Sequence, residues 1–132
     1  MREIGLVTLG GAAGAAARHL TDLAILNILA DSLLITGTFT VNVLGCFLLG
    51  GLFYHSTIFR NLNQELRLLL LVGFIGSYTT YSTFAAESVG LFAESAMYGV
   101  LYIAIQIPAG FLALWLGIVL MKQLNGRGRR SR

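Results

Sequence analysis

Four long apolar segments, separated by short clusters of charged residues, constrain this chain more than any other feature of its sequence. They cover about residues 4–28, 33–55, 66–91 and 96–121. Each is long enough to cross a bilayer, because a spanning helix needs roughly 20 mostly apolar residues. Only 11% of the 132 residues are charged, whereas a soluble domain carries about 25%. The sequence therefore predicts an all-α membrane protein with four transmembrane helices, in which residues 1–132 form a single integral membrane domain with a basic tail at 122–132.

The charged residues predict how the chain lies in the membrane. Short loops between four spans place both termini and the middle loop on one side. That side carries eight of the nine Lys and Arg residues, namely Arg2, Arg60, Arg67, Lys122, Arg127, Arg129, Arg130 and Arg132. Because positively charged loops stay in the cytoplasm, we expect a multi-pass protein of the cell membrane with cytoplasmic termini. We expect the tail to be a disordered basic end near the lipid headgroups, with no role in nucleic-acid binding.

Polar side chains gather in the middle of the third apolar segment, within Gly73–Phe84. This stretch reads GFIGSYTTYSTF and carries five hydroxyl groups from Ser and Thr. Polar groups at membrane depth are costly unless they face a partner or a water-filled path. Glycine there allows the backbone to leave the helix or to approach an ion closely. The stretch is therefore the first candidate for a functional site.

Two amide side chains lie deep in other predicted spans. Asn42 is one helical turn from Thr38 on the same face. An amide and a hydroxyl can both donate hydrogen bonds to an anion, but they can equally join neighbouring helices. Gln106 precedes Pro108 by two residues, and the proline cannot donate a backbone hydrogen bond. Gln106 can therefore satisfy a freed carbonyl or face a pore, and the sequence leaves these alternatives open.

Glycines mark the faces on which helices approach each other closely. Gly10 and Gly14 are four residues apart in the first segment, and Gly45 and Gly50 lie in the second. Small residues at this spacing allow close helix contact. Packing within the monomer accounts for most of these glycines, but their number suggests more helix contact than four helices alone need. Four thin helices rarely enclose a pore alone, so we expect assembly through the glycine-rich faces, with a twofold dimer as the simplest closed form.

Several classes of function have little support in the sequence. Cys46 is the only cysteine, so no internal disulfide can form. His19 and His55 have no second ligand at metal-binding spacing on a shared face, which argues against a transition-metal site. The chain also lacks a catalytic triad, a nucleotide-binding loop and a pair of membrane-embedded carboxylates. We therefore expect that it is not an enzyme.

Three motifs resemble those of one known family. Gly73–Phe84 closely resembles the third-helix motif G-F-x-G-G-x-T-T-F-S-T-F of the Fluc (CrcB) fluoride channels, and Ala85-Ala-Glu87 continues it. Gly10–Arg18 is similar to the family's G-G-x-x-G-x-x-x-R, and Gly37–Gly45 to its G-T-x-x-x-N-x-x-G. The similarity spans the whole chain, and the length and the four-span layout agree with it.

The resemblance implies a fluoride-specific ion channel that lowers cytoplasmic fluoride by passive efflux. It implies an antiparallel dimer with two pores, a third helix broken in mid-membrane, and a structural, non-transported sodium ion at the dimer centre. The backbone carbonyls implied to hold sodium belong to Gly76 and Thr79. The residues implied to line the pore are Asn42, Tyr81, Ser82, Thr83, Phe84 and Gln106.

The chain departs from the family pattern at two positions and in its charge balance. Tyr81 replaces the first pore phenylalanine and adds a hydroxyl, while Ser77 replaces the second glycine of the motif. Identical antiparallel subunits need balanced loops, so the charge bias suggests one-way insertion and pairing with an inverted, related subunit; a homodimer is the alternative.

Two other functions remain open at this stage. One is a four-helix exporter of the small multidrug resistance type, although such a protein needs a carboxylate deep in the first span. The other is a non-transporting membrane assembly subunit, in which the hydroxyl groups and Asn42 only join helices.

Overall fold

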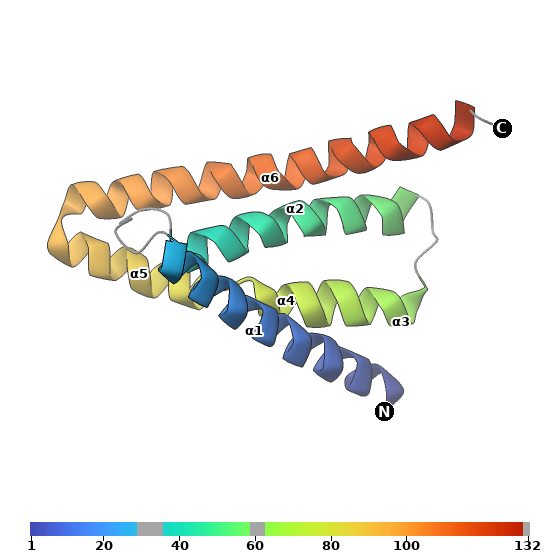
Figure 1. Ribbon diagram of the computed structural model, residues 1–132, viewed down its shortest axis with the longest axis horizontal. Coiled ribbons are helices and arrows are strands. Elements are labelled where there is room, and N and C mark those ends of the chain that lie inside the picture. Colours follow the sequence, from blue (N-terminus) through green and yellow to red (C-terminus); the bar gives the residue numbers. More distant parts are fainter. Residues whose placement is uncertain (29–35, 59–62, 131–132) are drawn as a thin grey trace.

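The computed structural model describes residues 1–28, 36–58 and 63–130, and within these ranges all regular structure is helical. The elements are α1 (Arg2–Ile28), α2 (Gly37–Ile58), α3 (Gln64–Arg67), the π-helical η1 (Leu68–Ile75), α4 (Gly76–Tyr78), α5 (Tyr81–Glu94) and α6 (Ala96–Arg130). The prediction of an all-α membrane protein is confirmed. The third predicted segment is the one that the structure divides, since α3, η1 and α4 follow one another directly and α5 begins after an interruption (Figure 1).

The helices run up and down, so both termini lie at the same end of the molecule. Figure 1 shows the N-terminus, the C-terminus and the α2–α3 connection at one end, and the turn from α5 to α6 at the other. At the first end, Arg2 Nη1 lies 3.1 Å from Glu65 Oε1, and Gln64 Nε2 donates a hydrogen bond of 2.9 Å to Glu3 Oε1. These contacts fix the start of α1 beside the start of α3, as expected for an even number of spans with short connections.

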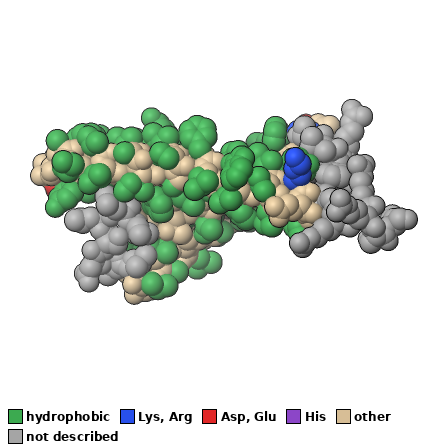
Figure 2. All heavy atoms as spheres, turned by 90° about the horizontal axis from the view of Figure 1, so that it is seen from above, with side chains coloured by type: hydrophobic (Ala, Val, Ile, Leu, Met, Phe, Trp, Pro, Cys, Tyr) green, Lys and Arg blue, Asp and Glu red, His purple; other side chains and the backbone are tan. Residues whose placement is uncertain are grey.

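Among the described residues, three stretches are long and apolar enough to cross a membrane: Gly37–Tyr54, Gln64–Glu94 and Ala96–Leu124. Helix α1 has 27 residues, which correspond to about 40 Å at 1.5 Å per residue, but its glycines, Arg18 and Asp22 lower its hydropathy. Its crossing of the membrane stays a prediction. Apolar side chains cover most of the surface drawn in Figure 2, as a lipid environment requires.

The glycines bring helices of the same chain into backbone contact. A Cβ atom added at Gly10 would meet the carbonyl oxygen of Leu69, and one at Gly14 would meet that of Phe74, so α1 packs directly on η1. In the same way, a Cβ at Gly50 would meet the carbonyl oxygen of Leu114, which joins α2 to α6. At these three glycines the close contacts are made within one chain, and assembly with a second chain stays a prediction.

The C-terminal end of the chain also differs from the prediction. Helix α6 passes through Pro108 without ending and continues to Arg130, so a disordered tail is wrong for residues 122–130. Three parts of the predictions lie outside the described residues: the connection at 29–35 with the start of the second predicted span, residues 59–62 of the middle loop, and residues 131–132 of the tail.

The close packing of α1 on η1 gives a testable prediction. Gly10→Ala is expected to lower the stability of the protein by about 1–3 kcal/mol, because the new methyl group would overlap backbone that has no room to move. The measurement is the thermal unfolding midpoint of the purified protein in detergent. Gly5→Ala is the matched control on the same helix, since nothing lies within 4 Å of a Cβ at Gly5. Equal midpoints for the two variants would contradict the packing described.

Candidate functional site

The third spanning stretch is interrupted at its centre. Helix α4 ends at Tyr78, and both Thr79 (φ −83°, ψ 156°) and Thr80 (φ −146°, ψ 117°) have extended backbone before α5 begins at Tyr81. Thr79 still bonds back to the carbonyl of Ile75 through its N–H (3.1 Å) and its hydroxyl (3.0 Å). Thr80 caps α5, because its Oγ1 accepts a hydrogen bond from the N–H of Thr83 at 3.2 Å. The predicted mid-membrane break is therefore present, at these two residues.

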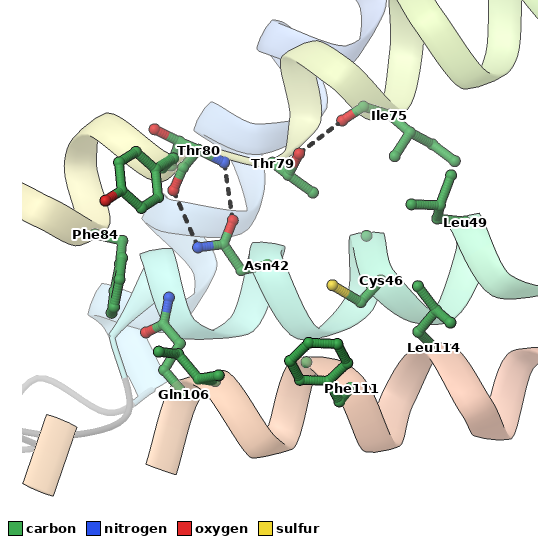
Figure 3. A pocket seen from close by; sticks show the side chains of 14 residues that line it. Asn42, Cys46, Leu49, Ile75, Thr79, Thr80, Phe84, Gln106, Phe111 and Leu114 are labelled. Carbon is green, nitrogen blue, oxygen red and sulfur yellow. Dashed lines mark hydrogen bonds between the residues drawn. The ribbon is translucent and has the colours of Figure 1, made fainter. Parts of the chain in front are cut away.

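The side chain of Asn42, on α2, fills the gap in the backbone. Its Oδ1 accepts the N–H of Thr80 at 2.8 Å, and its Nδ2 donates to the carbonyl of the same residue at 3.1 Å (Figure 3). Thr80 is only 7% exposed, so unpaired backbone groups there would be costly. Asn42 therefore joins helices, one of the two alternatives that the sequence left open. This pairing uses one of the two Nδ2 hydrogens and leaves the second for another acceptor.

An open groove of about 400 Å³ runs along α2 and α6 and reaches the break. Its walls are mostly apolar, and the residues lining it are Asn42, Gly45, Cys46, Leu49, Ile75, Thr79, Thr80, Tyr81, Phe84, Gln106, Ile107, Gly110, Phe111 and Leu114. The groove thus brings together four of the six residues named for the pore: Asn42, Tyr81, Phe84 and Gln106. An apolar channel with a few polar groups is the usual form of a small-ligand site.

The other two residues named for the pore lie beside this groove rather than in its wall. Ser82 and Thr83 begin α5, and their hydroxyl oxygens lie 3.2 Å and 3.0 Å from the hydroxyl oxygen of Thr80. Both residues are exposed on the single chain. The three hydroxyl groups form a polar cluster at the start of α5.

Two aromatic rings stand next to the break. The ring of Phe84 lies 6.0 Å from that of Tyr81 and 5.7 Å from that of Tyr102, measured between ring centroids. Tyr102 is buried at 1% exposure, whereas Tyr81 is 81% exposed. Phe84 therefore packs against the buried ring of Tyr102 on one side, and against the surface-exposed ring of Tyr81 on the other. Ring edges carry partial positive charge, so such rings can approach an anion.

Gln106 contributes an unmatched polar group to the groove. The residue is 6% exposed, and within the described part of the chain its Oε1 atom has no hydrogen-bond partner. A buried polar atom without a partner costs about 1–3 kcal/mol. In Figure 3 the amide lies between Phe84 and Asn42. The position favours the groove-facing alternative for Gln106, because a water molecule in the groove can donate a hydrogen bond to Oε1.

A polar cluster around Glu87 was missed by the sequence analysis. The Glu87 carboxylate accepts hydrogen bonds from the hydroxyl groups of Thr36 (3.1 Å), Thr38 (2.7 Å) and Tyr102. Thr38 was expected to act with Asn42, but it turns to this carboxylate instead. A charged residue within an apolar segment was the available signal, because such a group needs donors on neighbouring helices. The cluster ties α2 and α6 to α5.

The break also determines which groups could hold a cation. Among the described residues no three His, Cys, Asp or Glu side chains gather as a metal site, whereas the interrupted backbone offers carbonyl oxygens. In a continuous helix the N–H of Thr80 would bond to the carbonyl of Gly76, but here it is donated to Asn42. Gly76 is exposed on the single chain. Hard cations prefer oxygen ligands, so the carbonyls of Gly76 and Thr79 fit the chemistry of a sodium ion.

A spanning helix broken beside a groove with uncharged polar groups is typical of channels and transporters, where irregular backbone lines a path through the protein. The sequence model described as "CrcB-like protein, Camphor Resistance (CrcB)" matches residues 5–118. The chain belongs to this family, and the resemblance predicted from the three motifs is confirmed.

Relatives from diverse organisms match nearly the whole chain. "Fluoride-specific ion channel FluC 1" of Methanospirillum hungatei is 41% identical over 98% of this chain and 83% of its own length. "Fluoride-specific ion channel FluC" of Bacteroides fragilis is 40% identical over 95% of this chain and all of its own length. "Fluoride-specific ion channel FluC 2" of Rhodococcus jostii is 43% identical over 85% of this chain and 92% of its own length. These names describe ion channels, so the prediction of a non-enzymatic protein is confirmed.

The Glu87 cluster gives a second testable prediction. Tyr102→Phe removes one donor from the carboxylate while keeping the ring against Phe84, and it is expected to lower stability by about 1.5–3 kcal/mol, the usual value of a hydrogen bond to a charged group. Thermal unfolding in detergent measures the effect. Tyr98→Phe, one turn earlier on α6 and 41% exposed, is the matched control and is expected to behave like the wild type. A Tyr102→Phe protein as stable as this control would show that the hydroxyl contributes nothing.

Proposed function

We propose that this chain is a fluoride-specific ion channel that lowers cytoplasmic fluoride by passive efflux. The names of its relatives support fluoride as the conducted ion. The observation that carries the proposal within this chain is the meeting of Asn42, Phe84 and Gln106 in one groove at the helix break. None of these groups is charged, and together they offer amide hydrogens and aromatic ring edges.

The chemistry of the groove suits a small, strongly hydrated anion. A path for fluoride must replace the water that the ion gives up. Amide donors of Asn42 and Gln106 can do so, and the edge of Phe84 can present ring hydrogens while its bulk narrows the path. Conduction requires binding weak enough to allow exit, and neutral donors meet this requirement better than a lysine or an arginine would.

The proposal includes a second chain. The groove is open along one side and Tyr81 is exposed beside it, so an antiparallel dimer would complete two pores from two such grooves. A structural sodium ion at the dimer centre would be held by the carbonyls of Gly76 and Thr79, and its charge would favour a nearby anion path. The termini lie on the cytoplasmic side, as the distribution of Lys and Arg favours.

Fluoride efflux from proteoliposomes that contain only this protein tests the function. We expect fluoride-selective release with no comparable chloride release, and at least about tenfold slower fluoride release for Phe84→Ile, which removes the ring edge from the groove. Asn42→Asp should fail similarly, because it places a negative charge on the anion path. Phe92→Ile makes the same change on the same helix against Gly99, outside the groove, and should retain the flux. A small multidrug-type exporter or an assembly subunit would give no fluoride-selective release from any of these proteins.

The same assay decides the composition of the dimer. The bias of eight Lys and Arg on one side against one on the other favours insertion in a single direction, and hence a heterodimer with an inverted, related subunit. For a heterodimer we expect fluoride-selective release from the chain alone to be slow but measurable, and to become faster after coexpression with an inverted companion. Strong flux without a companion would establish the homodimer instead and would leave the fluoride-channel function intact.

A further inference from the structure

The backbone N–H of Thr80 has two possible acceptors, and which one it uses decides the state of the helix break. In an uninterrupted α-helix it would bond to the carbonyl four residues earlier, at Gly76. In this structure it bonds to Asn42 Oδ1 at 2.8 Å instead. The carbonyl of Gly76 thereby loses its helical donor and is left available to another partner. One side chain on α2 therefore controls a backbone ligand on the neighbouring segment.

Two further contacts hold the amide of Asn42 against the break. Its Nδ2 donates to the Thr80 carbonyl at 3.1 Å, so the amide cannot rotate without losing both bonds. Gly45, one turn further along α2, allows the close approach, because a Cβ atom there would meet Cγ2 of Thr79. Thr80 itself is 7% exposed, and in so dry a place its N–H must have an acceptor. Without the amide of Asn42, the nearest acceptor that the helix provides is the carbonyl of Gly76.

We propose that Asn42 is a positioning residue for the central cation: by keeping the N–H of Thr80, it holds the carbonyl of Gly76 open for sodium. The inference rests on the proposed function, in which Gly76 and Thr79 carbonyls bind that ion, and adds a role for a side chain that does not touch it. It also links the anion groove to the cation site through a single amide. Any change that displaces this amide should weaken sodium binding as well as fluoride flux.

The test compares two substitutions that affect the Thr80 N–H differently. Asn42→Ala removes the acceptor, so the N–H of Thr80 should bond to the Gly76 carbonyl again and make that carbonyl unavailable to sodium. Asn42→Asp keeps an oxygen that can accept the N–H and should leave the Gly76 carbonyl open. Sodium is expected to raise the thermal unfolding midpoint of the purified protein. The readout is the sodium concentration that gives half of this rise, called the sodium midpoint below. Potassium or N-methylglucamine keeps the ionic strength constant.

We expect the sodium midpoint of Asn42→Ala to rise at least about tenfold, and that of Asn42→Asp to stay at or below the wild-type value although both variants lose fluoride flux. Leu44→Ala is the matched control, because Leu44 lies on the same helix, is 45% exposed and does not line the groove. Gly45→Ala provides a second variant should Asn42→Ala fail to fold, since it keeps the amide but pushes α2 away from Thr79. Its sodium midpoint should also rise.

Unchanged sodium midpoints in Asn42→Ala and Gly45→Ala would overturn the proposal, and so would an equal rise in Asn42→Ala and Asn42→Asp. A wild-type protein whose stability does not respond to sodium would overturn it together with the sodium part of the proposed function. Fluoride release by that same wild-type protein reports separately on the channel itself, so the two failures can be told apart.

Discussion

The structure depends on how a polypeptide backbone can leave a helix in the middle of a membrane. Each unpaired N–H or carbonyl there costs several kcal/mol in hydrocarbon, so an interruption needs dedicated partners. Asn42 supplies one partner for each backbone polar group of Thr80, and the hydroxyl of Thr80 in turn caps α5. With these groups satisfied, the chain can place extended backbone beside the groove. The amide of Gln106 and the hydroxyl groups of Ser82 and Thr83 lie near this interruption.

Helix packing gives the interruption a firm setting on both sides. Glycines bring α1 into contact with η1 and α2 into contact with α6 through backbone atoms rather than through flexible side chains. Tyr78 is the last residue before the break. Its ring stacks on that of Phe74 with 5.9 Å between centroids, and its hydroxyl oxygen lies 3.1 Å from that of Thr21 on α1. The break is thus held by contacts to both α1 and α2.

The sequence predicted the helices well because apolar length and charge position follow directly from the lipid environment. It also drew attention to the hydroxyl-rich stretch, since polar groups at that depth are rare. It could not show that Thr38 turns to Glu87, because spacing along one helix defines a face and not what lies opposite. The glycines pointed to close contacts but not to which chain makes them, and the π-helical geometry of η1 leaves no mark in a run of leucines. Helical continuation through the basic tail was equally hidden.

In the proposed dimer, the exposed position of Gly76 has a consequence for a copy that has not yet met its partner. In a lone chain Gly76 is exposed and its carbonyl lacks its helical donor, while surrounding acyl chains would offer no hydrogen bond. Such a state is costly, so the stability of each copy becomes tied to how densely copies are supplied per lipid. Dilution into excess lipid would then leave solitary copies prone to local rewinding, and synthesis of the two partner chains close together in time and place would be favoured.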